Sequence, residues 1–345
     1  MANIIICADG TWNRPEEDIE KDYPTNVLKL VRAIKPSGSS LKQHVFYDWG
    51  LGSYHNSISA GATGRGIHKN ILDGYRYIVQ NYGHNDKIYL FGFSRGAYTV
   101  RALCGLINNC GILKRVDANR IAEAWDIYKS ASKKNHPDGD DAVKFRSDHC
   151  HGSRKVHFVG VWDTVGALGI PFSLMGLFES KDEFYDTKMG SNVSFARHAL
   201  AIDEQREDFQ PTVWTPRPGV DLKQVWFSGV HADVGGSYKP DRDSGFVAAD
   251  TPLAWMLDEA KNAGLKIEPH IREALATSDG AKLHKSRGHV YRLKRPLHRH
   301  LEVDNKPTKI HPSVKARYIA DDSYRPPRLK SLIEDKGWDE LDVGN

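Results

Sequence analysis

The chain has 345 residues, of which 40% are hydrophobic and 27% charged, with a net charge of +4. This composition is typical of a globular protein and argues against a disordered or membrane-embedded chain. The net charge is small for the length, so no nucleic-acid partner is expected.

The first predicted element is a buried strand at the apolar run 4–8. The run has no basic region before it and is too short for a signal peptide or a membrane span, so we expect a cytoplasmic protein. The cysteines form no Cys-x-x-Cys pair, and a chain of this size does not need disulfides, so reduced thiols are expected. They are Cys7, Cys104, Cys110 and Cys150.

Helices and strands are predicted to alternate along the rest of the chain. Repeated alternation of this kind favours a mostly parallel sheet with helices on its faces. Further strands are expected at 43–48, 87–91, 155–162 and 224–228. Helices are expected from Asn26 as the capping residue to Ile34, and at 67–82, 96–108, 118–132, 195–202 and 251–262.

Ser94 lies between the strand expected at 87–91 and the helix expected at 96–108, with Gly92 and Gly96 on either side. The Gly-x-Ser-x-Gly pattern is weak alone. Between a strand and a helix it predicts a nucleophile elbow, a sharp turn that needs small flanking residues. We therefore expect an α/β-hydrolase-like fold with Ser94 as nucleophile. The alternative is an ordinary turn with a capping serine.

We expect one such domain over 1–320 and a C-terminal tail over 321–345. Within the domain, a helical insertion is expected at about 114–154 and an apolar, lid-like loop at about 168–190.

A serine nucleophile needs a histidine base oriented by a carboxylate, and this fold supplies them in the order Ser, Asp, His. Asp163 directly follows a predicted strand, so it should emerge at the same sheet edge as Ser94. The alternative is that Asp163 caps the turn at Thr164. For the base, His231 follows the strand at 224–228. His311 competes, because it would follow a last strand such as 289–293, and position favours His231 only slightly.

The oxyanion hole should take one backbone N–H from Arg95, which follows the nucleophile, and another from a loop at the same edge. Gly10 and Thr11, after the first strand, are candidates, although Asp9 and Gly10 also read as an ordinary turn.

Four motifs now stand in order: Asp-Gly-Thr-Trp-Asn at 9–13, Gly-Phe-Ser-Arg-Gly-Ala-Tyr at 92–98, Val-Trp-Asp-Thr-Val-Gly at 161–166 and Gly-Val-His-Ala-Asp-Val-Gly-Gly at 229–236. Together they resemble the DUF2235 family, the Tle1-like catalytic domain of type VI secretion phospholipase effectors. The resemblance runs from Ile4 to about Trp255, with a weaker echo at His311.

The resemblance implies a serine esterase with a Ser94, Asp163 and His231 triad, and it favours His231 over His311. It also implies a lipid ester, such as a glycerophospholipid, as substrate. The secreted effectors generally carry a further C-terminal region for membrane attachment, and we expect no such region in this chain, so export by a specialised secretion system stays an open expectation. The sequence does not define the oligomeric state.

The apolar segment at 170–178 could overhang the pocket and hold an acyl chain, or it could fill the core. The basic stretch 285–300, including Lys294, Arg295, His298, Arg299 and His300, is interpreted mainly as a solvated face, with peripheral contact to anionic lipid as the alternative. The pocket candidates are Asp9, Phe93, Phe172, Leu174 and Met175.

The sequence also offers residues for other classes of function. A haloacid-dehalogenase phosphatase would need an aspartate where Cys7 stands. A metal-dependent hydrolase could use Asp9, Asp163, His231 and Asp233, and a non-catalytic binding module is the third option. We expect neither a cofactor nor a metal ion.

Overall fold

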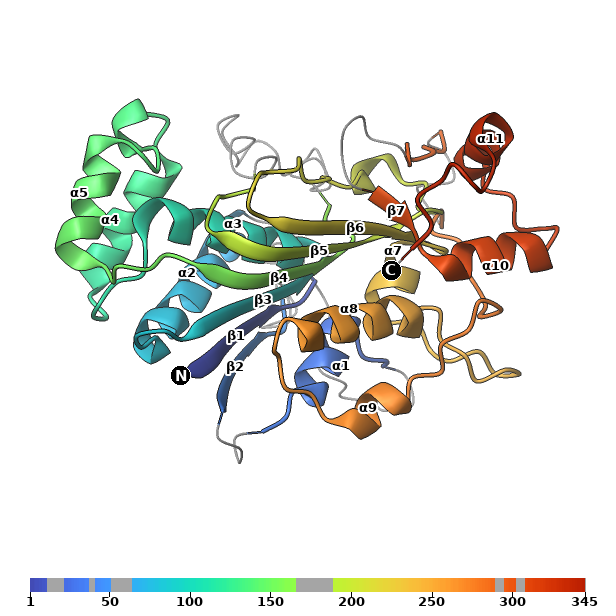
Figure 1. The fold of residues 1–345 in the computed structure, drawn as a ribbon, viewed down its shortest axis with the longest axis horizontal. Helices are drawn as coiled ribbons and strands as arrows, with labels where there is room; N and C mark the ends of the chain where they lie inside the picture. Colours follow the sequence, from blue (N-terminus) through green and yellow to red (C-terminus); the bar gives the residue numbers. More distant parts are fainter. Residues whose placement is uncertain are drawn as a thin grey trace.

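A computed structural model of the chain describes residues 1–10, 22–36, 41–50, 64–165, 189–288, 295–301 and 308–344. Within this part, seven strands form one sheet in the order β2-β1-β3-β4-β5-β6-β7, and every neighbouring pair is parallel (Figure 1). The strands are β1 (Ala2–Ala8), β2 (Lys42–Asp48), β3 (Lys87–Phe93), β4 (Val156–Trp162), β5 (Val193–Ala201), β6 (Asp221–Phe227) and β7 (Thr308–Ile310).

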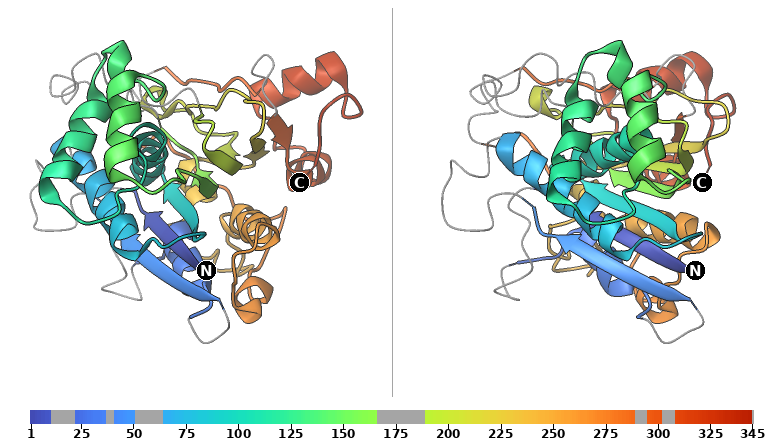
Figure 2. Two further views of the ribbon diagram at one scale, coloured as in Figure 1. Left: turned by 60° about the vertical axis from the view of Figure 1, so that its left-hand side comes forward. Right: turned by 90° about the vertical axis from the view of Figure 1, so that its left-hand side faces the viewer.

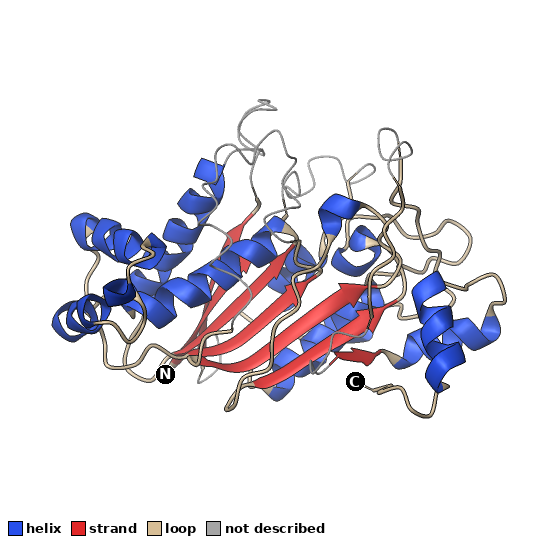
Figure 3. Ribbon diagram, turned by 90° about the horizontal axis from the view of Figure 1, so that it is seen from above, coloured by secondary structure: helices blue, strands red, loops and turns tan. Residues whose placement is uncertain are grey.

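Helices cover both faces of the sheet (Figures 2 and 3). On one face, α2 (Gly64–Asn81) and α3 (Arg95–Cys110) bury apolar residues that include Ile4 and Ile6 of β1. On the other, α1 (Asn26–Ala33) and α8 (Asp250–Asn262) bury Ile5 and Cys7. Alternate side chains of β1 therefore enter opposite cores, which is why the run reads as continuously apolar.

Two further groups of helices lie at opposite ends of the molecule. Helices α4 (Ala118–Lys129) and α5 (Asp140–His149) pack beside α3, in the segment for which an insertion is expected. At the opposite end lie α10 (Pro312–Ala320) and α11 (Pro327–Lys336), whose side chains form a third core with β6 and β7. The short helices α7 (His231–Gly235) and α9 (Pro269–Glu273) flank α8.

The helix expected at 195–202 is wrong, because this segment is strand β5. The run of alanine, leucine, arginine and histidine suits a helix by intrinsic preference. In the molecule it pairs with β4 and β6 and is buried on both faces, so no two-residue alternation of polarity marks it as a strand.

The cap of α1 is also one residue earlier than expected. Thr25 caps the helix by accepting the N–H of Leu28 at 3.2 Å, whereas Asn26 is buried and donates to the carbonyls of Val234 and Ala249. The strand preceding His311 is β7. The strand expected at 289–293 lies wholly outside the described residues, as does most of the lid-like loop at 168–190.

The fold is thus the expected α/β class, with a parallel central sheet flanked by helices in the α/β-hydrolase-like manner. All four cysteines are free and buried. Among the described helices, none combines the length and the apolar character that crossing a membrane would require.

Candidate active site

Ser94 occupies a strained turn between β3 and α3. Its backbone has φ 58° and ψ −123°, a combination that residues other than glycine rarely adopt. A Cβ on Gly92 would lie 2.5 Å from the carbonyl oxygen of Gly96, and a Cβ on Gly96 would lie 2.0 Å from the carbonyl oxygen of Ala8. Glycine is therefore required on both sides of Ser94. The serine side chain is half-buried and makes no capping hydrogen bond to α3, so the capping interpretation does not describe this turn.

Asp163 and His231 meet at the same edge of the sheet. His231 Nδ1 lies 2.6 Å from Asp163 Oδ2, and Asp163 is fully buried with φ 38°. Asp163 Oδ1 also accepts the N–H of Ala201 at 3.0 Å. Because the ionised carboxylate only accepts, Nδ1 carries the hydrogen and Nε2 is the nitrogen that can take up a proton. Asp163 does not cap Thr164, whose N–H instead donates to His198 Nε2 at 3.2 Å.

The His231 ring is held between two phenylalanines. Its centroid lies 4.6 Å from that of Phe93 and 4.9 Å from that of Phe209, the latter edge-on. Gly235 allows this packing, because a Cβ there would lie 1.9 Å from the Phe93 ring. Phe93 directly precedes Ser94, and the Ser94 N–H donates to the Trp162 carbonyl at 3.2 Å, one residue before Asp163. Ser94, Asp163 and His231 therefore follow the carboxyl ends of β3, β4 and β6 at one edge of the sheet, with β5 between the last two strands.

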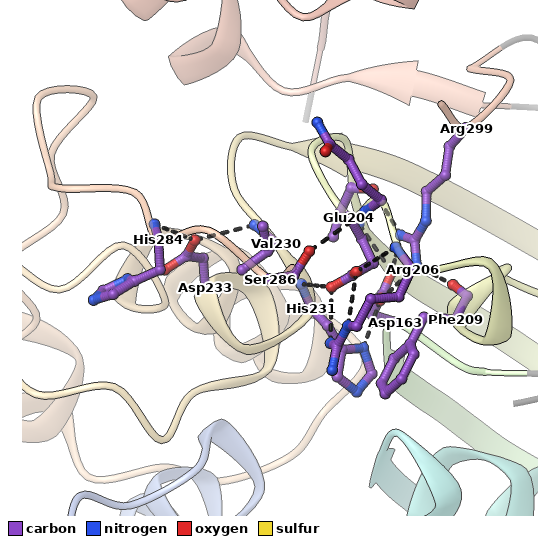
Figure 4. Close-up of polar contacts among 12 residues, drawn as sticks. Asp163, Glu204, Arg206, Phe209, Val230, His231, Asp233, His284, Ser286 and Arg299 are labelled. Carbon is purple, nitrogen blue, oxygen red and sulfur yellow. Dashed lines mark hydrogen bonds and ion pairs between the residues drawn. The ribbon is translucent and has the colours of Figure 1, made fainter. Parts of the chain in front are cut away.

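Arg299 completes the surroundings of Asp163 (Figure 4). Its side chain is 1% exposed, and its Nη1 and Nη2 lie 2.7 and 3.0 Å from the two carboxylate oxygens. The guanidinium also donates to the carbonyls of Ala201 and Phe209. Burial alone would raise the pKa of Asp163, but the charges and hydrogen bonds of Arg299 and His231 outweigh it and hold the pKa below its usual range.

The solvated-face interpretation of the basic stretch is thus wrong for Arg299. The neighbouring Arg295 and His300 are exposed and His298 is half-buried, whereas Lys294 lies outside the described residues. Within the described part of the segment 285–300 Arg299 alone is buried, which leaves no periodic signal. No motif surrounds it either. Sequence reasoning could have found it only by asking what neutralises a buried Asp163.

A second carboxylate and arginine, also missed from the sequence, hold the other side of His231. Glu204 has a fully buried side chain and accepts the backbone N–H of His231 at 3.2 Å. Arg206 binds both oxygens of Glu204 at 2.9 Å and stacks 3.5 Å above the Phe209 ring. Burial opposes ionisation of Glu204, yet the hydrogen bonds and charge of Arg206 lower its pKa.

The loop after β1 abuts the elbow, since the carbonyl oxygens of Ala8 and Asp9 are those that a Cβ on Gly96 would strike. Asp9 is buried and accepts the N–H of Gly10 at 2.8 Å and the hydroxyl of Tyr47 at 2.9 Å. The Gly10 N–H therefore points at Asp9 here and not toward an oxyanion.

The remaining oxyanion and pocket candidates divide into two groups. Arg95 is the first residue of α3, where N–H groups have no acceptor within the helix. Phe93 packs on His231. Thr11, Phe172, Leu174 and Met175 lie outside the described residues.

His311 lies in different surroundings from Asp163 and His231. It caps α10, its Nδ1 is 2.7 Å from the hydroxyl of Ser313, and its ring stacks on Phe227 with centroids 4.6 Å apart. It lines a cavity of about 530 Å³ between α8 and α10, whose lining includes Trp255. Burial lowers its pKa to about 4.

The four residues considered as metal ligands, Asp9, Asp163, His231 and Asp233, do not come together at one point. Asp233 accepts from Val230 N–H at 3.0 Å and pairs with His284 Nδ1 at 2.7 Å, and Figure 4 shows this pair apart from Asp163 and His231. Asp9 is held by the β1 loop and β2. Over the described ranges, no three His, Cys, Asp or Glu side chains are placed to hold a metal ion together.

Comparison with known proteins gives a family match and weaker relatives. Residues 2–259 match the family model described as the type VI secretion phospholipase effector Tle1-like catalytic domain. A Saccharomyces cerevisiae protein, YEL023C, itself uncharacterized, is 28% identical over 239 residues, which cover 63% of this chain and 33% of the yeast protein. The chain thus spans about a third of that relative's length.

Solved structures show more distant likeness. An uncharacterized protein from Pseudomonas aeruginosa has a TM-score of 0.47 at 17% identity, covering 79% of this chain and 47% of the other. The Tle1 effector bound to the VgrG spike of a type VI secretion system has a TM-score of 0.37 at 18% identity, covering 69% and 51%. A metagenomic carboxyl esterase has a TM-score of 0.36 at 11% identity, covering 79% and 76%.

Proposed function

Because the chain belongs to the Tle1-like catalytic domain family of type VI secretion phospholipase effectors, we propose that it cleaves carboxylic esters of lipids with Ser94 as nucleophile, His231 as base and Asp163 as the orienting carboxylate. The observation that carries the proposal is the 2.6 Å contact between His231 Nδ1 and Asp163 at the sheet edge where Ser94 stands in its strained turn. The family supplies the class of substrate, and the side chains supply the mechanism.

In this mechanism, His231 Nε2 takes the Ser94 hydroxyl proton as Oγ attacks the ester carbonyl. The tetrahedral intermediate collapses, the C–O bond to the alcohol breaks, and His231 returns the proton to the leaving alkoxide. Water, deprotonated by His231, then attacks the acyl-serine, releasing the acid and restoring Ser94. Asp163 holds the ring so that Nε2 faces the serine and stabilises the imidazolium.

Backbone N–H groups would hold the oxyanion. Arg95 supplies the first, at the start of α3. For the second we propose Thr11 in preference to Gly10, because the Gly10 N–H donates to Asp9. The pocket for the acyl chain would include Phe93 and the apolar segment that holds Phe172, Leu174 and Met175.

The substrate would reach the site as an ester lipid in a membrane or micelle, through peripheral contact with an anionic surface. Export by a specialised secretion system would bring the protein to that membrane, and before export it would lie in the cytoplasm. We also propose that the catalytic domain extends beyond the matched residues 2–259 to about 320, because Arg299 closes the site around Asp163.

The test pairs labelling with hydrolysis. A fluorophosphonate probe should label wild-type protein but not Ser94→Ala, because it reacts only with an activated serine. Against short p-nitrophenyl esters, longer-chain esters and phospholipid vesicles, Ser94→Ala should lose several orders of magnitude in turnover with its fold intact. Full turnover in that variant would falsify the assignment, and inhibition by EDTA would favour the metal-dependent alternative. A folded wild type that neither labels nor hydrolyses would indicate a binding module.

If the protein hydrolyses only acetyl or butyryl esters and releases no fatty acid from vesicles, the lipid part of the proposal fails. The serine mechanism would then stand for a small-ester hydrolase.

A further inference from the structure

Arg299 makes the acid of the proposed triad unlike a solitary carboxylate. A guanidinium stays charged at all accessible pH values, and this one spans both oxygens of Asp163 from a position that is 1% exposed. Two backbone carbonyls fix the same guanidinium in place. Because Nη1 and Nη2 each bind one carboxylate oxygen and one backbone carbonyl, the guanidinium sets the plane of the Asp163 carboxylate. It thereby sets the direction of the hydrogen bond to His231.

In the part of the chain that the structure describes, the charged groups close to His231 come in pairs. Asp163 is neutralised by Arg299, and Glu204, which accepts the His231 N–H, is neutralised by Arg206. Behind Asp163, burial and Arg101 lower the pKa of His198 to about 3, so that ring is neutral.

Two further carboxyl groups, on Asp233 of α7 and on Asp203 after β5, bind other partners. Asp233 pairs with His284, and Asp203 accepts the N–H of Gly229 at 2.6 Å. Burial raises the pKa of Asp203 to about 6. Among the described residues, the charges near an imidazolium at His231 are thus close to balanced, without the excess negative charge that a lone carboxylate would provide.

We propose that Arg299 is a positioning residue that fixes the Asp163 carboxylate for His231 and, through its charge, offsets the negative charge that Asp163 places beside the imidazole. This inference rests on the proposed triad. It goes beyond it in assigning the acid limit of activity to an arginine that lies 40 residues past the end of the family match at 259.

The chain offers a matched control for the loss of a buried arginine. Arg197 is 3% exposed, binds Glu259 and Asp221, and has no contact with Asp163 or His231. Its replacement removes a comparable buried charge from the middle of β5. Any effect common to Arg197→Gln and Arg299→Gln is therefore structural.

The experiment measures kcat/KM for a p-nitrophenyl ester and the rate constant of fluorophosphonate labelling from pH 4 to 9. Both follow the protonation of the free enzyme, and labelling reads only folded molecules. In Arg299→Gln, the acid limb should move up by about one pH unit, since a like charge near the base has been removed. Arg197→Gln should leave the limb in place.

Arg299→Lys separates charge from geometry. One ammonium keeps the charge but cannot span both oxygens and both carbonyls. Its acid limb should stay near that of wild type while kcat falls about tenfold at constant KM. If Arg299→Gln does not fold, the test rests on Arg299→Lys alone. A wild-type kcat in Arg299→Lys overturns the positioning role.

Superimposable acid limbs in wild type and Arg299→Gln would overturn the charge role. Failure of the underlying triad looks different, because Ser94→Ala would then hydrolyse the ester at the wild-type rate. An inactive Ser94→Ala with unshifted Arg299 variants refutes only this inference.

Discussion

Gly96 is the residue whose replacement tests the elbow most sharply. An added Cβ would lie 2.0 Å from the Ala8 carbonyl oxygen and 2.6 Å from that of Asp9, and both atoms belong to the backbone at the carboxyl end of β1, an interior strand of the sheet. Neither can rotate away. Overpacking of this kind costs about 3 kcal/mol, and the better helix propensity of alanine in α3 returns about 1 kcal/mol, so Gly96→Ala should lose about 2 kcal/mol of unfolding free energy.

The activity loss should exceed the stability loss. Relief of the clash must move α3 away from β1, and displacement of a nucleophile by about 1 Å can cost about a hundredfold in rate. Urea unfolding followed by circular dichroism gives the free energy, and ester turnover under native conditions gives kcat.

Gly152 provides the control, since a Cβ there meets nothing within 4 Å. Gly152→Ala should lie within about 0.5 kcal/mol of wild type with full activity. If Gly96→Ala matched Gly152→Ala in both stability and kcat, the tight contact between elbow and β1 loop would not constrain the site, and the reasoning would be refuted.

Three further predictions concern the base, the pH dependence of stability and the extent of the domain. His231→Ala should abolish turnover and serine labelling while His311→Ala keeps most of both; the reverse pattern would make His311 the base. Because burial raises the pKa of Asp203 to about 6, its contribution to stability is full below the unfolded value near pH 4 and is lost as pH rises through 6. The free energy of unfolding of Asp203→Asn, which cannot ionise, should therefore rise relative to that of wild type by up to about 3 kcal/mol between pH 4 and pH 7. Urea unfolding at the two pH values measures this, and an equal difference at both would contradict the prediction. A chain ending at residue 259 lacks Arg299 together with the end of α8, β7, α10 and α11, and should show no fluorophosphonate labelling even where it is soluble; wild-type labelling would place the whole catalytic site within 1–259.

The position of the candidate site could be predicted because parallel strands bring their carboxyl ends to one edge. Ser94, Asp163 and His231 each follow a short apolar run, so local patterns placed them at that edge together. The choice between His231 and His311 could not come from position alone, since β7 also ends there. The family resemblance favoured His231, and the contact with Asp163 is consistent with it.

What the sequence did not reveal lacks a local pattern. Arg299 and Glu204 act through contacts with residues distant in sequence, and neither belongs to a motif. Strand β5 was predicted as a helix because burial on both faces removes the polarity alternation that identifies a strand. Long-range pairing decided these cases, and a single sequence does not display it.

The ion pair between Arg299 and Asp163 joins residues 136 apart in the chain. Contacts of such separation form late, because the entropy of closing a long loop must be offset by structure that already exists. The acid of the proposed triad therefore cannot acquire its final setting until the C-terminal segment has docked on the sheet. On dilution from denaturant, full catalytic activity should therefore lag behind the return of helical circular dichroism.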